Sequence, residues 1–184
     1  MPVWLIVLII VIVIIALFVV STYNGLVSSR NKVRDQFSQI DVQLKKRADL
    51  IPNLVETVKG YAKHESETLE KIIEARNEYV NAKDETEKIK ASSELSSGIS
   101  KLFALAESYP DLKANSNFLD LQNQLKDIED KIGYARQFYN DSVLIYNNKI
   151  EMFPSNIVAG MFHFTKESFF EANETERENV KVKF

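Results

Sequence analysis

The sequence predicts an all-α protein in which a single N-terminal transmembrane helix is followed by an antiparallel four-helix bundle. Three observations predict this fold class. Residues 3–20 form an unbroken apolar run, and no Asp, Glu, Lys or Arg occurs before Arg30. Beyond that run, apolar residues recur at spacings of three and four, which is the period of an amphipathic helix. The 184 residues include only 5 Gly and 4 Pro, too few for a turn-rich β fold.

The apolar run has the length of a membrane-spanning helix. Its 18 residues would cover roughly 27 Å, close to the roughly 30 Å hydrocarbon core of a bilayer. Trp4 and Tyr23 bracket the run, where aromatic rings favour the two membrane interfaces. A cleaved signal peptide would show a basic start and a small-residue cleavage site, and a buried core helix would need a larger protein around it. We therefore expect a retained anchor over residues 1–23.

Basic residues after the run predict the orientation. Arg30, Lys32 and Arg34 follow it closely, and Lys/Arg-rich flanks stay in the cytoplasm. The prediction is a single-pass protein of the cell (inner) membrane with the N-terminus outside and the C-terminal domain cytoplasmic. The residues expected at the membrane interface are Trp4, Tyr23, Arg30, Lys32 and Arg34. The lipid bilayer is thus the first predicted partner.

Residues 24–153 are predicted to form the helical-bundle domain. The apolar stripes place its four helices at residues 26–47, 51–79, 95–106 and 118–153. Asp49 is a suitable N-cap and Pro52 suits a first turn, so a new helix is expected there. Residues 81–93 lose the stripe and are expected to be a solvated connection. A long coiled coil is the competing fold, but these interruptions favour helices that fold back.

Two polar features fall on the stripes. Glu65 and Arg76 lie on the second stripe and are candidates for a buried ion pair that fixes the helix register, the alternative being a peripheral position. Tyr139-Asn140 and Tyr146-Asn147 are seven residues apart and share one helix face. Core tyrosines with hydroxyls at the rim are the preferred interpretation of this face, and a ligand ledge is the alternative. Asn115, Ser116 or Asn117 can cap the last helix.

Residues 154–184 form an aromatic-rich C-terminal segment and tail. This segment either caps the bundle or contacts the membrane or a protein partner, as apolar aromatic helices do at interfaces. Residues 178–184 alternate apolar and polar side chains and are expected to be a disordered tail or a docking peptide. The candidate contact residues are Phe162, Phe164, Phe169 and Phe170.

Composition narrows the function classes. With 0 Cys and 2 His, the chain has no thiolate metal site, disulfide or cysteine nucleophile and few ways to build a histidine-based site. Thr68 stands where a zincin helix needs its second His after His64, and the glycines are isolated rather than gathered in a phosphate-binding loop. A net charge of -3 disfavours nucleic-acid binding. No enzyme, cofactor, metal site or nucleic-acid partner is expected.

Short sequence segments along nearly the whole chain resemble the bacterial LemA family. The segments are YNGLV at 23–27, RN at 30–31, QIDVQLKKR at 39–47, DLIPNLVETVKGY at 49–61, HE at 64–65, YPDLKAN at 109–115, NF at 117–118, AR at 135–136, YN at 139–140 and 146–147, and FP at 153–154. Two positions depart from the family pattern: Phe37 stands where Trp is frequent, and His163 stands where Gly is common.

The resemblance implies an N-terminally anchored helical-bundle protein of the bacterial cell membrane. A protein of this kind is similar to relatives implicated in membrane organisation, including magnetosome formation. The family has no established catalytic residues. Some relatives are encoded near a membrane metalloprotease, so a membrane protease is one candidate for the unidentified protein partner. The expected function is a non-enzymatic, membrane-tethered scaffold or adaptor. A sensor bundle that binds a small molecule between its helices is the alternative, and a homo-oligomer stays open.

Overall fold

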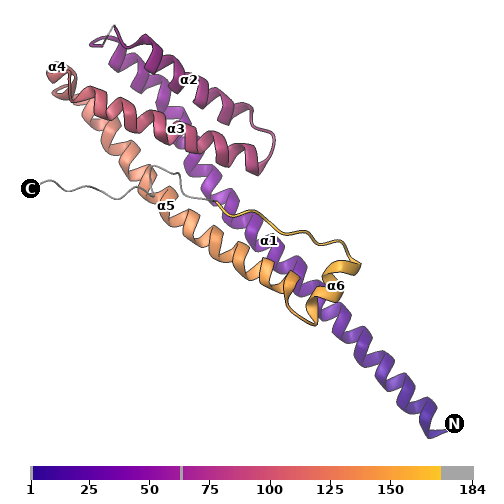
Figure 1. Cartoon of the computed structure of the whole chain (residues 1–184). Coiled ribbons are helices and arrows are strands. Elements are labelled where there is room, and N and C mark those ends of the chain that lie inside the picture. Colours follow the sequence, from indigo (N-terminus) through magenta and orange to yellow (C-terminus); the bar gives the residue numbers. More distant parts are fainter. Residues whose placement is uncertain (1, 63, 171–184) are drawn as a thin grey trace, which may run out of the picture. The chain divides into compact units, whose positions relative to one another are not determined.

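The computed structural model describes residues 2–62 and 64–170, and most of them are helical (Figure 1). No strand occurs in these two ranges, which confirms the predicted all-α class. The predicted tail at residues 178–184 lies outside them. The helices are α1 Val3–Lys59, α2 Ser66–Asn81, α3 Glu85–Ala106, α4 Pro110–Lys113, α5 Ser116–Glu151 and α6 Ser155–Met161.

The described chain divides into two compact units, and both α1 and α5 contribute to each. The first unit combines residues up to Gln36 with Gln137–Phe169. The second unit combines Phe37–Arg136 with Phe170. The predicted division into residues 1–23, 24–153 and 154–184 stays a prediction.

The second unit has a continuous apolar core built by five helices. The later part of α1, the hairpin of α2 and α3, the short α4 and the start of α5 all place residues in it, and Figure 1 shows α2 and α3 side by side. The core residues are Ile51, Leu54, Val55, Val58, Ala62, Leu69, Ile72, Ala75, Leu95, Ile99, Leu102, Ala106, Leu112, Phe118 and Leu125. Most of them lie on the predicted stripes.

The expected helix break at Pro52 does not occur, because α1 continues through this proline to Lys59. Proline lacks the N–H that would bond the carbonyl four residues earlier, so the Ala48 carbonyl loses its helical partner. Arg76 of α2 supplies a substitute, since its Nε donates a long hydrogen bond of 3.5 Å to that carbonyl. The cost of proline inside the helix is thereby partly offset from a neighbouring helix.

The helix predicted at residues 51–79 is instead divided. Its first part belongs to α1, which ends at Lys59 just before Gly60, and α2 begins at Ser66. A glycine after a last basic residue is a sequence signal for the end of a helix, although Gly60 does not take the left-handed conformation of the usual glycine cap. The predicted stripe continues beyond the end of α1, because Ala62 lies outside both helices and is still buried.

The predicted connection at residues 81–93 is also shorter than expected, because α3 begins at Glu85. The Asp84 carboxylate accepts a hydrogen bond from the Glu87 backbone N–H at 2.8 Å, and the Glu87 carboxylate accepts one from the Lys83 N–H at 2.7 Å. This reciprocal arrangement resembles a capping box, which stabilises a helix start without apolar residues.

The start and end of α5 agree with the sequence. The Asn115 side chain accepts a hydrogen bond of 3.0 Å from the Phe118 N–H, so Asn115 is the cap among the three candidates. The helix ends at Glu151, before Phe153-Pro154.

Candidate membrane-interface site

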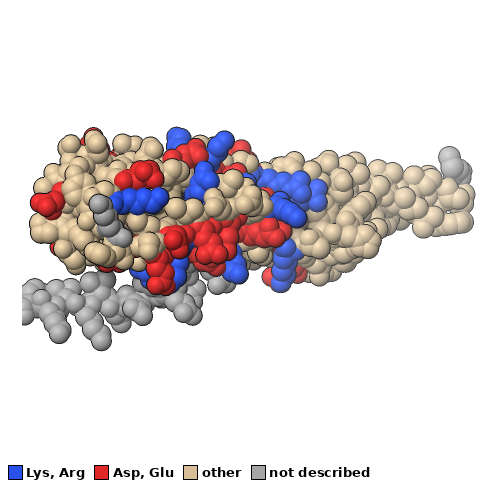
Figure 2. Space-filling view, turned by 90° about the horizontal axis from the view of Figure 1, so that it is seen from above, with Lys and Arg blue, Asp and Glu red and all other residues tan. Residues whose placement is uncertain are grey.

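The first residues of α1 form an exposed apolar surface of the first unit. The helix is long and apolar enough to cross a membrane, and none of the residues in its most apolar stretch is buried. In Figure 2 this part is the uncharged arm at the right, and the first charged side chains beyond the adjoining uncharged region are mostly Lys and Arg. Trp4, one of the predicted interface residues, is 67% exposed near its start.

Helix α6 packs against α1 close to the end of the apolar run. Val158 and Ala159 of α6 are each 1% exposed and form a buried cluster with Leu26 of α1. Val19, Ile150 and Phe164 pack against the same cluster. One face of α6 is therefore fixed to α1 between Val19 and Leu26.

A Schellman motif ends α6 and turns the chain back onto this cluster. The His163 N–H donates to the Gly160 carbonyl at 3.3 Å, and the Phe164 N–H donates to the Ala159 carbonyl at 3.0 Å. His163 has φ of 55°, the left-handed conformation that glycine adopts without steric cost. As is usual for this motif, the next residue, Phe164, contacts the last turn of the helix.

Two predicted interface residues meet the aromatic segment here. The Tyr23 ring lies 4.7 Å from the Phe162 ring and 5.7 Å from the Phe164 ring, between centroids. The Arg30 guanidinium carbon lies 5.0 Å from the Phe164 ring centroid, within range of a cation–π interaction. Lys32 and Arg34 are exposed further along α1.

The four candidate phenylalanines do not form one exposed patch. Phe162 and Phe169 are exposed at 47% and 44%, and Phe164 is half-buried. Phe170 belongs to the second unit and is 3% exposed, with the Arg136 guanidinium carbon 5.8 Å from its ring centroid. The expectation of a shared, incompletely buried patch is therefore corrected for Phe170.

Other strongly exposed apolar side chains of this region were not among the candidates. Phe153 is 79% exposed, Ile157 is 55% exposed and Met161 is 62% exposed. The spacing of four would have paired Ile157 with Met161 in the sequence, since residues at that spacing share one helix face, whereas Phe153 lies in the turn before α6.

The Tyr-Asn face of α5 binds the chain's own C-terminal segment. The Tyr146 hydroxyl donates to the Thr165 carbonyl at 3.0 Å, and the Tyr139 hydroxyl donates to the Ser168 carbonyl at 2.9 Å. The Asn147 side chain donates to the Glu167 carbonyl at 2.9 Å and accepts from the Glu167 N–H at 3.0 Å. The two tyrosines are seven helical residues apart and their two carbonyl acceptors are three extended residues apart, and both distances are about 10 Å. The hydroxyls and the carbonyls are therefore spaced alike. The tyrosines are buried, as preferred, and the ledge carries a peptide segment rather than a ligand.

These contacts also affect the Tyr146 hydroxyl. Burial raises its pKa above the ordinary value, and the nearby Glu167 carboxylate adds to the increase, while Arg30 and Arg34 oppose it. The Tyr146 hydroxyl therefore stays protonated, as its donation to Thr165 requires.

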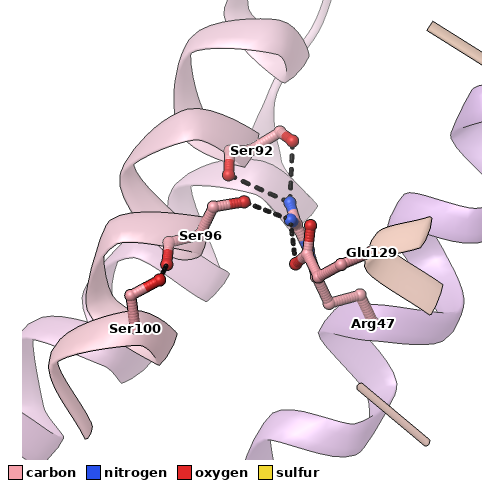
Figure 3. A network of polar contacts seen from close by, with 5 residues as sticks. All are labelled: Arg47, Ser92, Ser96, Ser100 and Glu129. Atoms are coloured by element: carbon pink, nitrogen blue, oxygen red, sulfur yellow. Dashed lines mark hydrogen bonds and ion pairs between the residues drawn. The ribbon is translucent and has the colours of Figure 1, made fainter. Parts of the chain in front are cut away.

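The second unit contains a buried arginine that the sequence analysis did not select. Arg47 is 1% exposed, and its guanidinium donates to the Glu129 carboxylate at 2.7 Å, to the Ser92 carbonyl at 2.9 Å and to the Ser92 hydroxyl at 2.7 Å (Figure 3). It also donates to the Ser96 hydroxyl. The network joins α1, α3 and α5. The sequence did contain a signal for this residue, because Arg47 occupies a position on the first apolar stripe where a core side chain is expected.

The structure does not join Glu65 to Arg76. The Tyr109 hydroxyl donates to the Glu65 carboxylate at 3.1 Å, whereas Arg76 donates to the Ala48 carbonyl and, at 3.1 Å, to the Asn77 side chain. Both residues are half-buried rather than buried. Arg47, whose side chain is 1% exposed, forms an ion pair with the partly exposed Glu129 instead.

A groove of about 390 Å³ lies between α2 and α3. Its charged lining includes Lys71, Glu74, Glu78, Glu94 and Lys101. A hydrogen bond from the Glu94 carboxyl raises the pKa of Glu78 above its ordinary value. Within residues 2–62 and 64–170, no three His, Asp or Glu side chains gather closely enough to hold a metal ion.

Comparison with known proteins identifies similar chains. The model of the LemA family matches residues 36–184. Protein LemA of Metamycoplasma hominis is 30% identical over 158 residues, which cover 85% of this chain and 72% of that protein. Magnetosome proteins MamQ 1 and MamQ 2 of Paramagnetospirillum magneticum are each 27% identical over 73 residues, which cover 40% of this chain and 27% of their own length.

Proposed function

The chain belongs to the LemA family, and from this premise we propose that it is a non-enzymatic scaffold tethered to the cell (inner) membrane. Residues 3–20 are the transmembrane segment, the N-terminus is outside, and the remaining domain is cytoplasmic. Arg30, Lys32 and Arg34 follow the apolar run on the cytoplasmic side, as the positive-inside rule requires.

One observation carries the proposal: the apolar run and the folded core share the single helix α1. The helix passes from its exposed apolar start through Leu26, which is 1% exposed in the first unit, to the core residues Ile51 and Val58 of the second. This continuity supports a retained anchor, because cleavage after the run would cut α1 next to a residue that is buried against α6.

In this proposal, the second unit is an antiparallel four-helix bundle made by the later part of α1, α2, α3 and the start of α5. Their shared apolar core supports the arrangement. The bundle offers its surface to a protein partner, for which a membrane protease is one candidate. Two relatives are named magnetosome proteins, which agrees with the membrane-organising role that the family resemblance implies.

The sensor function is the weaker alternative. Its ligand would occupy the groove between α2 and α3, which has the volume of a small-molecule site. Half of the residues that line this groove are Lys or Glu, as on an ordinary solvated helix face. The scaffold is therefore preferred.

Membrane retention tests the anchor. The full chain, tagged after Phe184, should stay with bacterial membranes after alkaline carbonate washing. Ile10→Arg combined with Ile14→Arg should release it, because each arginine at a bilayer centre costs about 3 kcal/mol. Val42→Arg with Val80→Arg is the matched control, since both valines are also about half exposed but lie outside the run. Release of the unaltered chain, or retention of the Ile10/Ile14 variant, contradicts the proposal.

Affinity capture tests the scaffold. The tagged full chain, solubilised from membranes in mild detergent, should recover a partner protein at a constant ratio. The same partner used as bait should recover this chain. A chain that is recovered alone in repeated captures, with the membrane retention test positive, contradicts the scaffold and leaves the anchor standing.

A further inference from the structure

We propose that three exposed apolar residues, Phe153 in the turn just before α6 and Ile157 and Met161 on the helix, are a second membrane contact that inserts into the interfacial region of the bilayer beside the transmembrane segment. This inference rests on the proposed function, because it requires residues 3–20 to lie in the bilayer. We call these three residues the α6 face.

Helix α6 has two distinct apolar sides. Val158 and Ala159 are buried against α1, whereas the three residues of the α6 face are between 55% and 79% exposed. Ile157 and Met161 are four residues apart and share one side of α6, and Phe153 lies in the turn that leads into the helix. Contiguous exposed apolar residues of this kind mark contact surfaces in soluble proteins and at membranes.

The depth of α6 indicates a lipid contact. Its buried side packs on Leu26, with Val19 against the same cluster, and Phe162 at its end contacts Tyr23. Tyr23 lies three residues beyond Val20, the last residue of the apolar run, which is about 4.5 Å along the helix. The headgroup region is roughly 5–8 Å thick on each side of the hydrocarbon core. Helix α6 is therefore at headgroup depth when the run spans the core.

The charge pattern fits the same occupant. Residues 152–165 contain no Asp, Glu, Lys or Arg, and the residues at the two ends of this segment, Glu151 and Lys166, form an ion pair. No charge has to be desolvated when the α6 face inserts. Arg30 and Lys149 lie next to this region, where they suit anionic headgroups, and Lys149 donates to the Ser29 hydroxyl at 2.7 Å.

Depth-dependent quenching of tryptophan fluorescence tests the inference in the full chain. Trp4 is the single tryptophan, so Trp4→Phe gives a background in which one new tryptophan reports alone. The reporter is Phe153→Trp. The matched control is Phe138→Trp, a 60% exposed position on α5 that lies twelve residues, or about 18 Å, from Ile150. The vesicles contain phosphatidylglycerol and phosphatidylcholine brominated near the top of the acyl chains.

Phe153→Trp should lose most of its fluorescence in brominated vesicles and emit at a shorter wavelength than Phe138→Trp, which should keep its intensity. If Phe153→Trp alters the far-ultraviolet circular dichroism, Ile157→Trp provides the same readout. Equal emission and no quenching at both positions would overturn the inference and leave the α6 face for a protein or a second copy. Quenching at both positions would also overturn it, because contact would not be specific to α6.

Trp4 in the unaltered chain separates this inference from the proposed function. Quenched Trp4 with unquenched Phe153→Trp and Ile157→Trp means that the anchor stands and the α6 contact is wrong. Unquenched Trp4 means that the anchor itself is wrong.

Discussion

Replacement of Arg47 by alanine should be among the most destabilising single changes in the second unit. Its guanidinium is buried and donates to Glu129, Ser92 and Ser96, which joins three helices. Removal of one partner from a buried ion pair costs about 3–5 kcal/mol. Because the Glu129 side chain is 36% exposed, water can replace part of the lost contact on that side. We therefore expect Arg47→Ala to cost roughly 4 kcal/mol, including the cavity it leaves.

Two further variants separate charge from packing. Glu129→Ala leaves the guanidinium buried with only serine partners and should cost about 2 kcal/mol, the lower value reflecting the exposure of Glu129. Arg47→Met with Glu129→Leu removes both charges and keeps most of the volume, so it should cost less than Arg47→Ala alone. The Nε atom of Arg47 has no hydrogen-bond partner within the described residues, which further favours an apolar replacement.

Urea unfolding of the protein from Arg30 onward, followed by far-ultraviolet circular dichroism, measures these differences. We expect this truncated protein to be soluble and strongly helical. Lys71→Ala, which breaks the exposed Lys71–Glu67 pair on α2, is the control and should leave the midpoint nearly unchanged. If Arg47→Ala and Glu129→Ala each cost less than about 1 kcal/mol, the network contributes little and the reasoning is refuted.

Three further predictions concern other contacts. Ile40→Asp, at a position that is 0% exposed, should cost roughly 3 kcal/mol or more in the same unfolding assay, and an unchanged melt would show that the stripe faces elsewhere. Burial and the hydrogen bond to Asp41 raise the pKa of Tyr79, so the stability that the protonated hydroxyl contributes is present below pH of about 10 and is lost as pH rises further. Tyr79→Phe should therefore be less stable than the unaltered protein at neutral pH by about 1 kcal/mol. A stability difference between the two that does not narrow at alkaline pH argues against this coupling. Asn147→Ala removes both hydrogen bonds to the Glu167 backbone and should accelerate amide exchange at Glu167, whereas unchanged protection there would show that the segment is held by other contacts.

The helical class and most of the core could be predicted from periodicity. Buried positions such as Ile40, Leu44, Leu125 and Ile132 lie on the predicted stripes, because a helix that packs against others must bury one face. The end of α5 and its Asn115 cap could also be predicted from the sequence, since caps and prolines act locally.

The helix boundaries that were missed depend on contacts from elsewhere in the chain. Pro52 predicts a break by local rules, but Arg76, distant in sequence, bonds the carbonyl that this proline leaves free. The stripe through residues 51–79 gave no sign of the gap before Ser66, because Ala62 stays buried without being helical. The polar residues 85–93 gave no apolar signal, and the cap at Asp84 starts α3 nonetheless.

The site was predicted in part. Tyr23 and Arg30 contact the aromatic segment, whereas Trp4 lies near the opposite end of the apolar run. Composition alone selected the phenylalanines, whereas exposure depends on which side of α6 meets α1. On α6, Val158 and Ala159 are buried against α1 while Ile157 and Met161 are exposed, whereas Phe170 lies outside this helix and is buried in the second unit.

Cysteine labelling in intact spheroplasts tests the central claim, a single membrane anchor with a cytoplasmic domain. The chain contains 0 Cys, so one introduced cysteine reports its own location. Val80→Cys, 53% exposed on α2, should react with a membrane-impermeant maleimide only after lysis. Val3→Cys, 76% exposed at the start of α1, should react before lysis. Labelling of Val80→Cys in intact spheroplasts, with Val3→Cys protected, would contradict the orientation and the cytoplasmic scaffold with it.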